Sequence, residues 1–473
     1  MNFSFKKQLI ALMAICLVSL SFAQTELKNK VVDFATYAPI ENASVYVQNT
    51  TIGTVSNVDG KFVLLVPNKH KNDTLVISSI GYKSFKTTVA EFDNTMDIFL
   101  EEDIASLDEI LLIAETRPKT GNDVVLKAIE RLEKTLPDSS YIQKGFLRHR
   151  ERNIKQYKWL IESAITLYDS SYAAGSRKNL KINVDETRKS FDLRDIDSLF
   201  VYTSYLKSID PDIDITSNTL NRNNLQTSAL EKAIKWNDQR INGLDNLFKG
   251  KLNIVRNANN TRALFGKDVL QDHQFTIDTI LVENDKKVYK IKIFEGEEYV
   301  NLETPGIYND GYHPRGWLYI DWDSYAIKKI EYELVPASTI QKRRSKSLFN
   351  SKVNHKLVIT YREFEDNMYP SYLYYETPKL VNIGNRSSDR PENESAETRE
   401  EQYYFTIQEI VFTEIIQDDQ VIAKALTDEW SSDIFLPRPY NKDFWESYNT
   451  LLESEEEEKL IRDLTRRATL FKE

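Results

Sequence analysis

Histidine has the widest range of chemical roles among the side chains of this sequence. The five histidines form no recognisable catalytic or metal site. They are His70, His149, His273, His313 and His355. No two stand at the separation typical of zinc ligands, and the H-E-x-x-H, G-x-S-x-G and phosphate-loop motifs are absent. Carboxylates are plentiful, so a hydrolase with an unrecognised carboxylate site stays an alternative. The sequence predicts a protein without catalytic residues, cofactor or metal.

One segment, between Gly306 and Trp317, combines side chains suited to ligand binding. It carries aromatic rings, an imidazole and a guanidinium on a backbone with glycine and proline, at Tyr308, Tyr312, His313, Arg315 and Trp317. Such a set can stack on a sugar ring or hold an acidic group. The alternative is an ordinary connection between strands whose rings pack locally. These five residues are the predicted ligand-binding site.

Residues 1–23 have the pattern of a cleavable signal peptide. Two lysines precede an apolar run from Leu9 to Leu20, and Ser21-Phe22-Ala23 then places small residues at the −3 and −1 positions of a cleavage site. The run is short for a membrane span, which disfavours an uncleaved anchor. A lipoprotein is disfavoured because Ile15, which is not a small residue, precedes Cys16. We therefore expect export and a mature chain without cysteine.

Charge and length limit the class of protein further. The chain has 473 residues and a net charge of −10, so it lacks the basic excess that phosphates attract. Nucleic-acid binding is therefore not expected. No later segment has 18 consecutive apolar residues, so no transmembrane helix is expected in the mature chain. The length suggests two or three domains.

The region from 26 to 100 alternates short apolar segments with turn residues. Strands are expected at Asn29–Asp33, Ala43–Gln48, Lys61–Val66, Thr74–Ser78 and Met96–Leu100. The Asp59-Gly60 pair is typical of a tight hairpin turn, and this explanation is preferred over a cation site. Short strands at regular spacing predict a β-sandwich.

This region also resembles the carboxypeptidase-regulatory-like domain. The resemblance rests on Val31-Val32-Asp33, Pro39–Val45, Gly53–Phe62, Ser78–Tyr82 and the later Leu107–Ile110. It is similar to the domain that precedes the plug of TonB-dependent receptors, and to the version in envelope proteins that lack a barrel. The resemblance implies a seven-stranded, transthyretin-like sandwich of the accessory kind, without catalytic function.

The remaining chain is expected to form an α+β domain after a linker at 102–119. Residues 120–247 are expected to be a mixed helical region, because apolar residues recur at helical spacing near Val124. Residues 248–416 alternate with period two, which predicts a large curved antiparallel sheet, with a mobile loop at 384–402. Residues 417–473 are expected to be a C-terminal helical segment in which Asp443 caps a helix.

The predicted fold class is mainly β with helices and more than one domain. An N-terminal transthyretin-like sandwich at 24–101 is followed by an α+β domain with a large curved antiparallel sheet. The hairpin from Gly316 to Leu334 is similar to hairpins in the half-barrel of periplasmic lipoprotein carriers.

These patterns favour a non-enzymatic, exported envelope protein that acts as a binding or interaction module. The expected location is a Gram-negative periplasm, with peripheral association with the outer membrane as an option. The expected partner is an outer-membrane protein, or an apolar or carbohydrate ligand. The alternatives are a periplasmic carrier of a lipid or other apolar ligand on a half-barrel sheet, and the hydrolase mentioned above.

Overall fold

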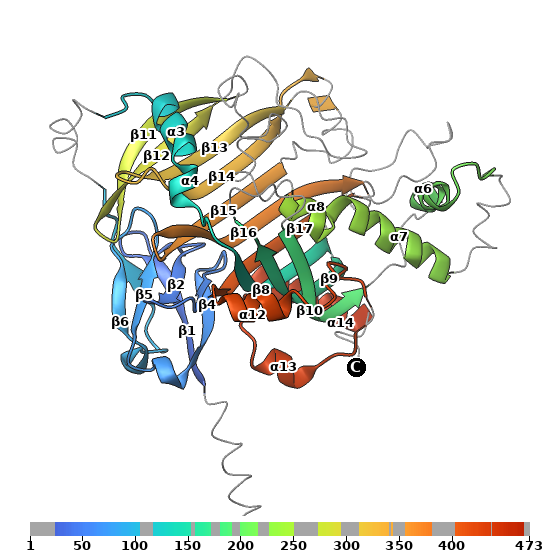
Figure 1. The fold of residues 1–473 in the computed structure, drawn as a ribbon, viewed down its shortest axis with the longest axis horizontal. Coiled ribbons are helices and arrows are strands. Elements are labelled where there is room, and N and C mark those ends of the chain that lie inside the picture. Colours follow the sequence, from blue (N-terminus) through green and yellow to red (C-terminus); the bar gives the residue numbers. More distant parts are fainter. Residues whose placement is uncertain are drawn as a thin grey trace, which may run out of the picture.

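The computed structural model shows a small β-sandwich beside a much larger curved sheet with helices (Figure 1). It describes residues 24–104, 117–152, 157–171, 180–191, 199–215, 227–249, 273–294, 312–339, 342–343, 355–380, 403–436 and 438–467. The predicted signal peptide, Tyr308, the 384–402 loop and residues 105–116 of the linker lie outside these residues.

The N-terminal sandwich has two sheets. Its strands are β1 (Gln24–Asp33), β2 (Ser44–Val47), β3 (Gly53–Val55), β4 (Lys61–Pro67), β5 (Thr74–Ser78), β6 (Phe85–Thr88) and β7 (Ile98–Leu100), with 3-10 turns at Asn68–His70 and Val89–Glu91. The strand orders are β4-β1-β7 and β3-β2-β5-β6. The predicted seven-stranded sandwich is confirmed, although the sequence analysis did not identify β3 and β6.

Alternation along β4 shows how the sandwich forms its core. Phe62, Leu64 and Val66 are buried between the two sheets, while the residues between them are partly exposed. A tight turn with Gly60 at φ +75° does precede β4, but it joins β3 and β4 of two different sheets, so the predicted hairpin is wrong. A side chain at Gly60 would place its Cβ 2.4 Å from the carbonyl oxygen of Val31, so glycine is required there.

The larger part is one antiparallel sheet with the strand order β10-β9-β8-β17-β16-β15-β14-β13-β12-β11. Its strands are β8 (Tyr141–Arg152), β9 (Tyr157–Asp169), β10 (Leu180–Phe191), β11 (Gln274–Glu283), β12 (Lys286–Phe294), β13 (Tyr312–Asp321), β14 (Ile327–Pro336), β15 (His355–Phe364), β16 (Asn367–Leu380) and β17 (Tyr403–Ile416). The predicted fold class, a sandwich followed by a large curved antiparallel sheet, is confirmed.

The mixed helical region expected at 120–247 needs correction. It contributes β8, β9 and β10 to the large sheet, and β8 pairs along its length with β17. Hydrogen bonds of one sheet therefore cross the boundary expected at 247. The helical prediction missed these strands because their charged residues, such as Arg148 and Glu162, hide the alternation of apolar positions.

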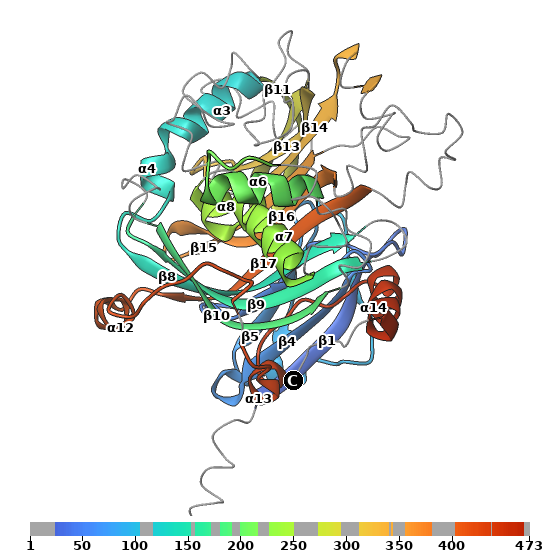
Figure 2. The same ribbon diagram turned by 90° about the vertical axis from the view of Figure 1, so that its right-hand side faces the viewer.

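Helices cover one side of the large sheet, which we call the inner face. They are α3 (Gly121–Glu130), α4 (Leu132–Thr135), α7 (Thr227–Asn242) and α8 (Leu244–Lys249), while α6 (Leu199–Ile209) packs on α7. Figure 2 shows the sheet curving around them. Val124 of α3 and Leu247 of α8 belong to the same apolar cluster as Ile291 and Ile359 of the strands. No helix among the described segments is long and apolar enough to cross a membrane.

The opposite side, the outer face, contacts the sandwich and the end of the chain. After α12 (Asp419–Ala425), residues 438–467 form what we call the C-terminal strap, with α13 (Lys442–Glu446) and α14 (Glu455–Arg467). The cap of α13 differs from the prediction: Asn441, not Asp443, accepts a hydrogen bond from the backbone N–H of Phe444. Asp443 lies within the first turn of α13, too late in the chain to cap it.

Candidate functional site

The structure places four of the five predicted ligand-binding residues on β13, and Tyr308 lies outside the described residues. Tyr312 belongs to the inner-face core, and its ring meets His355 edge to face at 5.4 Å. His313, Arg315 and Trp317 have the opposite parity along the strand, so they lie on the outer face. The structure therefore does not bring Tyr312 to the same surface as Arg315 and Trp317. The ligand-binding role of the five residues stays a prediction.

A glycine keeps this segment in strand form. Gly316 has φ +132°, and a Cβ there would lie 1.8 Å from the carbonyl oxygen of Glu331. The neighbouring Trp317 packs under the ammonium group of Lys290, 4.3 Å from the ring centroid. Thus the ring of Trp317 already has a cation within its own sheet.

The sandwich exposes a group of three aromatic rings, which we call the aromatic patch. Phe34 is 55% exposed, Tyr37 69% and Phe99 43%. The ring of Phe99 contacts Tyr37 at 5.7 Å and Phe34 at 6.3 Å between centroids, in both cases edge to face. Rings that contact one another while remaining open to solvent are typical of interaction surfaces, because they carry much apolar area with little side-chain freedom.

Strand alternation and a capped turn position the patch. In β7, Ile98 and Leu100 enter the sandwich core, so Phe99 between them projects outward. Tyr37 lies in a turn after β1 with φ +59°, a conformation that large side chains rarely adopt. Its N–H donates to the carbonyl oxygen of Asp33, at 2.9 Å. The turn therefore holds the Tyr37 ring in a defined place.

The Asp33 carboxylate organises this turn. One of its oxygens accepts hydrogen bonds from the backbone N–H of Thr36 (2.7 Å), the Thr36 hydroxyl (2.8 Å) and the backbone N–H of Ala35 (3.0 Å). The hydrogen bonds from Thr36 lower the pKa of Asp33. Burial and a hydrogen bond to Asp33 raise the pKa of Tyr82 to about 12, so this phenol stays neutral. The aromatic patch is thus supported by a polar network and is not a loose loop tip.

The sequence on either side of Phe99 is acidic. The segment 96–103 around Phe99 contains Asp97, Glu101, Glu102 and Asp103 and no basic residue. Lys83 neutralises one of these, with its ammonium 2.9 Å from Glu101. A complementary surface would therefore be apolar at its centre and basic at its rim.

The other sheet of the sandwich is docked within the chain. The backbone N–H of Gly81 donates to Val282 of β11, and the N–H of Val282 donates to Asp103. The guanidinium of Arg362 donates to the carbonyl oxygen of Thr51 at 2.8 Å. These contacts join the sandwich, through the segment after β5, the segment after β7 and the β2–β3 connection, to the edge strand β11 and to β15 of the large sheet.

The strap fixes the edge of the sandwich that β3 and β4 form. The Asn449 side chain makes two hydrogen bonds to the backbone of Leu65, at 2.7 and 3.2 Å. Asn57 donates to the carbonyl oxygen of Glu453, at 3.0 Å. Val55 packs in one apolar cluster with Phe146 of the sheet and Trp445 of the strap. Sandwich, sheet and strap therefore form one packed unit.

The inner face holds a second group of interest, a buried polar cluster under α7. Nε2 of His149 lies 2.9 Å from Oδ2 of Asp238, and both side chains are at most 1% exposed. In the part of the chain that the structure describes, Nδ1 of His149 and the hydroxyls of Ser163, Thr187 and Thr406 have no hydrogen-bond partner. Buried polar atoms without a hydrogen-bond partner are uncommon in a protein core, and water or a ligand usually pairs with them. The described residues contain no group of three or more side chains that could hold a metal ion.

The N-terminal part of the chain is similar to known proteins. Residues 27–112 match the family model described as the CarboxypepD_reg-like domain. The sandwich is a CarboxypepD_reg-like domain. The TonB-dependent receptor SusC of Bacteroides thetaiotaomicron is 33% identical over 133 residues, which are 27% of this chain and 13% of the receptor. The chain thus corresponds to a small part of that receptor's length, and the predicted relation to such receptors is confirmed for this part.

Two solved structures have some likeness to this chain. A DUF1329 family protein from Desulfovibrio piger is 7% identical, with a TM-score of 0.20 over 63% of this chain and 92% of its own. A putative membrane-associated protein of unknown function from Bacteroides fragilis is 9% identical, with a TM-score of 0.13 over 83% and 98%. Both TM-scores are too low to identify a shared fold.

Sequence reasoning missed the aromatic patch although a signal was present. The run Ile98-Phe99-Leu100 reads as one apolar strand, and its alternation alone implies that the middle ring points away from the core. The contact with Phe34 and Tyr37 could not be predicted, because it requires β7 to pair in parallel with β1.

Proposed function

We propose that this protein is a non-enzymatic component of a Gram-negative cell envelope, and that it binds a protein partner through the aromatic patch of its sandwich. The observation that carries the proposal is the division of the sandwich into a docked side and an exposed side. The docked side meets the chain's own sheet and strap, whereas Phe34, Tyr37 and Phe99 remain open to solvent in mutual contact. This leaves the patch as the surface that a partner can bury.

The chemistry of the partner follows from the charge around the patch. We expect an outer-membrane protein with an apolar groove flanked by lysine or arginine, since Asp97 and Glu102 lie beside Phe99 in the sequence. The signal-like N-terminus, the CarboxypepD_reg-like domain and the similarity to part of a TonB-dependent receptor support an exported, periplasmic location at the outer membrane.

The inner face supports the carrier and hydrolase alternatives less well. A carried ligand would have to reach Ser163 and Thr187, which are at most 1% exposed under the helices. A hydrolase would have to bring substrate to Glu151 or Asp238, which are buried to the same degree. The exposed rings of the patch need no rearrangement before they can bind.

Co-purification from detergent-solubilised envelopes tests the proposal. The full chain, expressed with an affinity tag, should retain one partner protein in stoichiometric amount, identified by mass spectrometry. The triple variant Phe34→Ala/Tyr37→Ala/Phe99→Ala should lose it, because aromatic rings at the centre of an interface contribute most of its affinity. Since these rings are solvent-exposed, the free energy of unfolding should change by no more than about 0.5 kcal/mol per substitution.

A matched control is Ile209→Ala, which removes an exposed apolar side chain (64%) from α6. This variant should retain the partner. Recovery of the wild-type chain alone, or equal recovery of the partner with the triple variant, would rule out the proposed role of the patch.

A further inference from the structure

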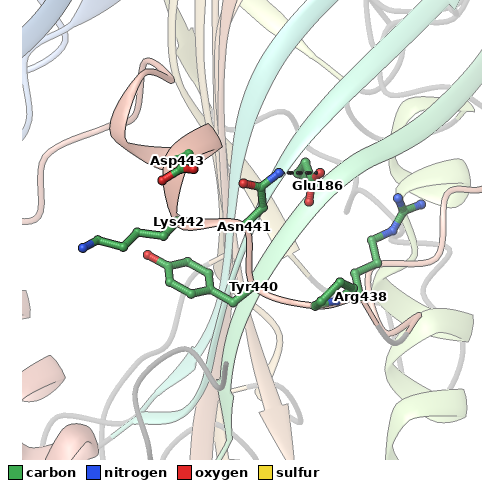
Figure 3. Close-up of a pocket in the computed structure, with 7 residues that line it drawn as sticks. Glu186, Arg438, Tyr440, Asn441, Lys442 and Asp443 are labelled. Atoms are coloured by element: carbon green, nitrogen blue, oxygen red, sulfur yellow. Dashed lines mark hydrogen bonds between the residues drawn. The ribbon is translucent and has the colours of Figure 1, made fainter.

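The C-terminal strap forms a surface pocket that the proposed function does not use. The pocket has a volume of about 460 Å³ and lies between the edge strand β10 and the start of α13. It is lined by Glu186 of β10 and by Arg438, Pro439, Tyr440, Asn441, Lys442 and Asp443 of the strap. Figure 3 shows Glu186 reaching toward Asn441, with Tyr440 and Lys442 on one side and Arg438 on the other.

Several contacts fix the walls of this pocket in place. Arg438 donates to the backbone carbonyl of Asp185 at 2.8 Å. Asn441 caps α13 through its oxygen, and its amide nitrogen lies 3.5 Å from a carboxylate oxygen of Glu186. These contacts matter because no binding free energy is lost in ordering a strap that is already ordered.

Aromatic anchors hold the strap just beyond the pocket. The indole of Trp445 is buried, and the guanidinium of Arg188 lies 4.6 Å from its ring centroid. The Tyr448 hydroxyl donates to the carbonyl oxygen of Gly145 on β8, at 2.9 Å. Tyr440 packs against the same apolar cluster. The pocket is thus part of the folded unit.

The side chains of the pocket determine which ligands it can hold. The lining includes two cations, Arg438 and Lys442, and two carboxylates, Glu186 and Asp443, so it has no net charge. Donors and acceptors are therefore mixed, together with a tyrosine ring and a proline. A strongly anionic or cationic ligand would meet one pair of like charges, and an apolar ligand would leave most of these polar groups unpaired.

We propose that the strap pocket binds a neutral oligosaccharide. A sugar offers hydroxyls that both donate and accept, which suits the mixed carboxylate, amide and guanidinium groups. Its C–H face can lie on the ring of Tyr440. The site lies on the strap and on β10, whereas the aromatic patch lies on the sandwich, so either proposal can fail without the other.

Calorimetric titration of the full mature chain with maltohexaose, cellohexaose, laminarihexaose and chitohexaose tests this inference. At least one should bind with a Kd of about 1 mM or tighter. Tyr440→Ala should weaken that binding about tenfold, and Tyr440→Phe should restore it to within about threefold, since the ring face is kept. Raising the salt from about 50 to 500 mM should leave the affinity nearly unchanged, because the ligand carries no charge.

Tyr37→Ala, in the aromatic patch, is the matched control and should bind the sugar as the wild type does. Circular dichroism should show the same fold for all three variants. The inference would be overturned if none of the four sugars bound, or if Tyr440→Ala bound them as tightly as the wild type does.

Discussion

The two sides of the sandwich differ in where their side chains find partners. The docked side meets the large sheet and the strap, and its polar groups are paired within the chain, as Asn57 is with Glu453 and Ser84 with Asn284. The other side carries Phe34, Tyr37 and Phe99, which pack only partly and stay exposed. We therefore expect the docked side to contribute most to stability, while our proposal assigns partner binding to the exposed side.

Beneath the docked side lies an ionic network that ties the strap to the sheet. The Arg148 guanidinium lies 2.7 Å from Glu162 and 3.0 Å from Glu453 of the strap. It also donates to the carbonyl oxygen of Leu451, at 2.7 Å. Arg150 binds Glu457 of α14 at 2.9 Å and Glu409 of β17 at 3.1 Å. We therefore expect this network to stabilise the packing of the strap on the sheet.

Removing Arg148 should have the largest effect on stability. Arg148→Ala leaves the carboxylate of Glu162, which is 0% exposed, with Arg188 as its remaining counter-charge among the described residues. We expect a loss of about 3–5 kcal/mol in the free energy of unfolding, measured by urea denaturation. The control Arg462→Ala removes an exposed arginine 4.0 Å from Glu458 and should cost about 0–1 kcal/mol. Equal losses in the two variants would contradict the structural role of the network.

Lowering the pH should have a smaller effect on the free energy of unfolding, and it should act through a glutamate of the same strap. Burial raises the pKa of Glu457, but the charges of Arg150 and Arg148 outweigh burial, so the net pKa is lowered from 4.5. A carboxyl with a lower pKa in the folded state stabilises the protein above its unfolded pKa, and this contribution is lost as pH falls below 4.5 through the folded value. The free energy of unfolding should therefore decrease below about pH 4.5.

Glu457→Gln should flatten this acid dependence. Glutamine can still complete the capping box that Glu457 forms with Ser454 at the start of α14. Glu453→Gln should steepen it, because burial raises the pKa of Glu453 and its protonation at low pH favours the folded state. Chemical denaturation at a series of pH values distinguishes the two variants. Parallel pH profiles of the free energy of unfolding for the wild type, Glu457→Gln and Glu453→Gln would contradict the roles given to these two glutamates.

Local sequence patterns predicted much of the fold. Period-two alternation at 248–416 predicted the sheet that contains the hairpins β11–β12, β13–β14 and β15–β16. Two-residue turns with both φ positive, Asn284-Asp285 and Glu365-Asp366, close the first and the third of these hairpins. Helical spacing near Val124 predicted α3. In each case the residues that decide the structure are close together in sequence.

The parts that could not be predicted depend on contacts between distant residues. β8 pairs with β17, and Phe146 lies opposite Val411, which no local pattern indicates. The strap pocket joins Glu186 to residues 438–443 in the same way. The predicted site on β13 was chosen by residue type, but alternation separates Tyr312 from Arg315 and Trp317. The burial of polar residues likewise depends on how the sandwich, the sheet and the strap pack together, and no local pattern predicts it.

The most direct test of the central claim is photo-crosslinking from the aromatic patch in intact cells. A photoreactive phenylalanine analogue at Tyr37 should leave the fold unchanged, because this ring is 69% exposed. Under light it should form an adduct with one envelope protein, and the same analogue at Ile209 on α6 should form none with that protein. Absence of an adduct at position 37, or the same adduct from both positions, would contradict the proposal that the exposed side of the sandwich binds a partner.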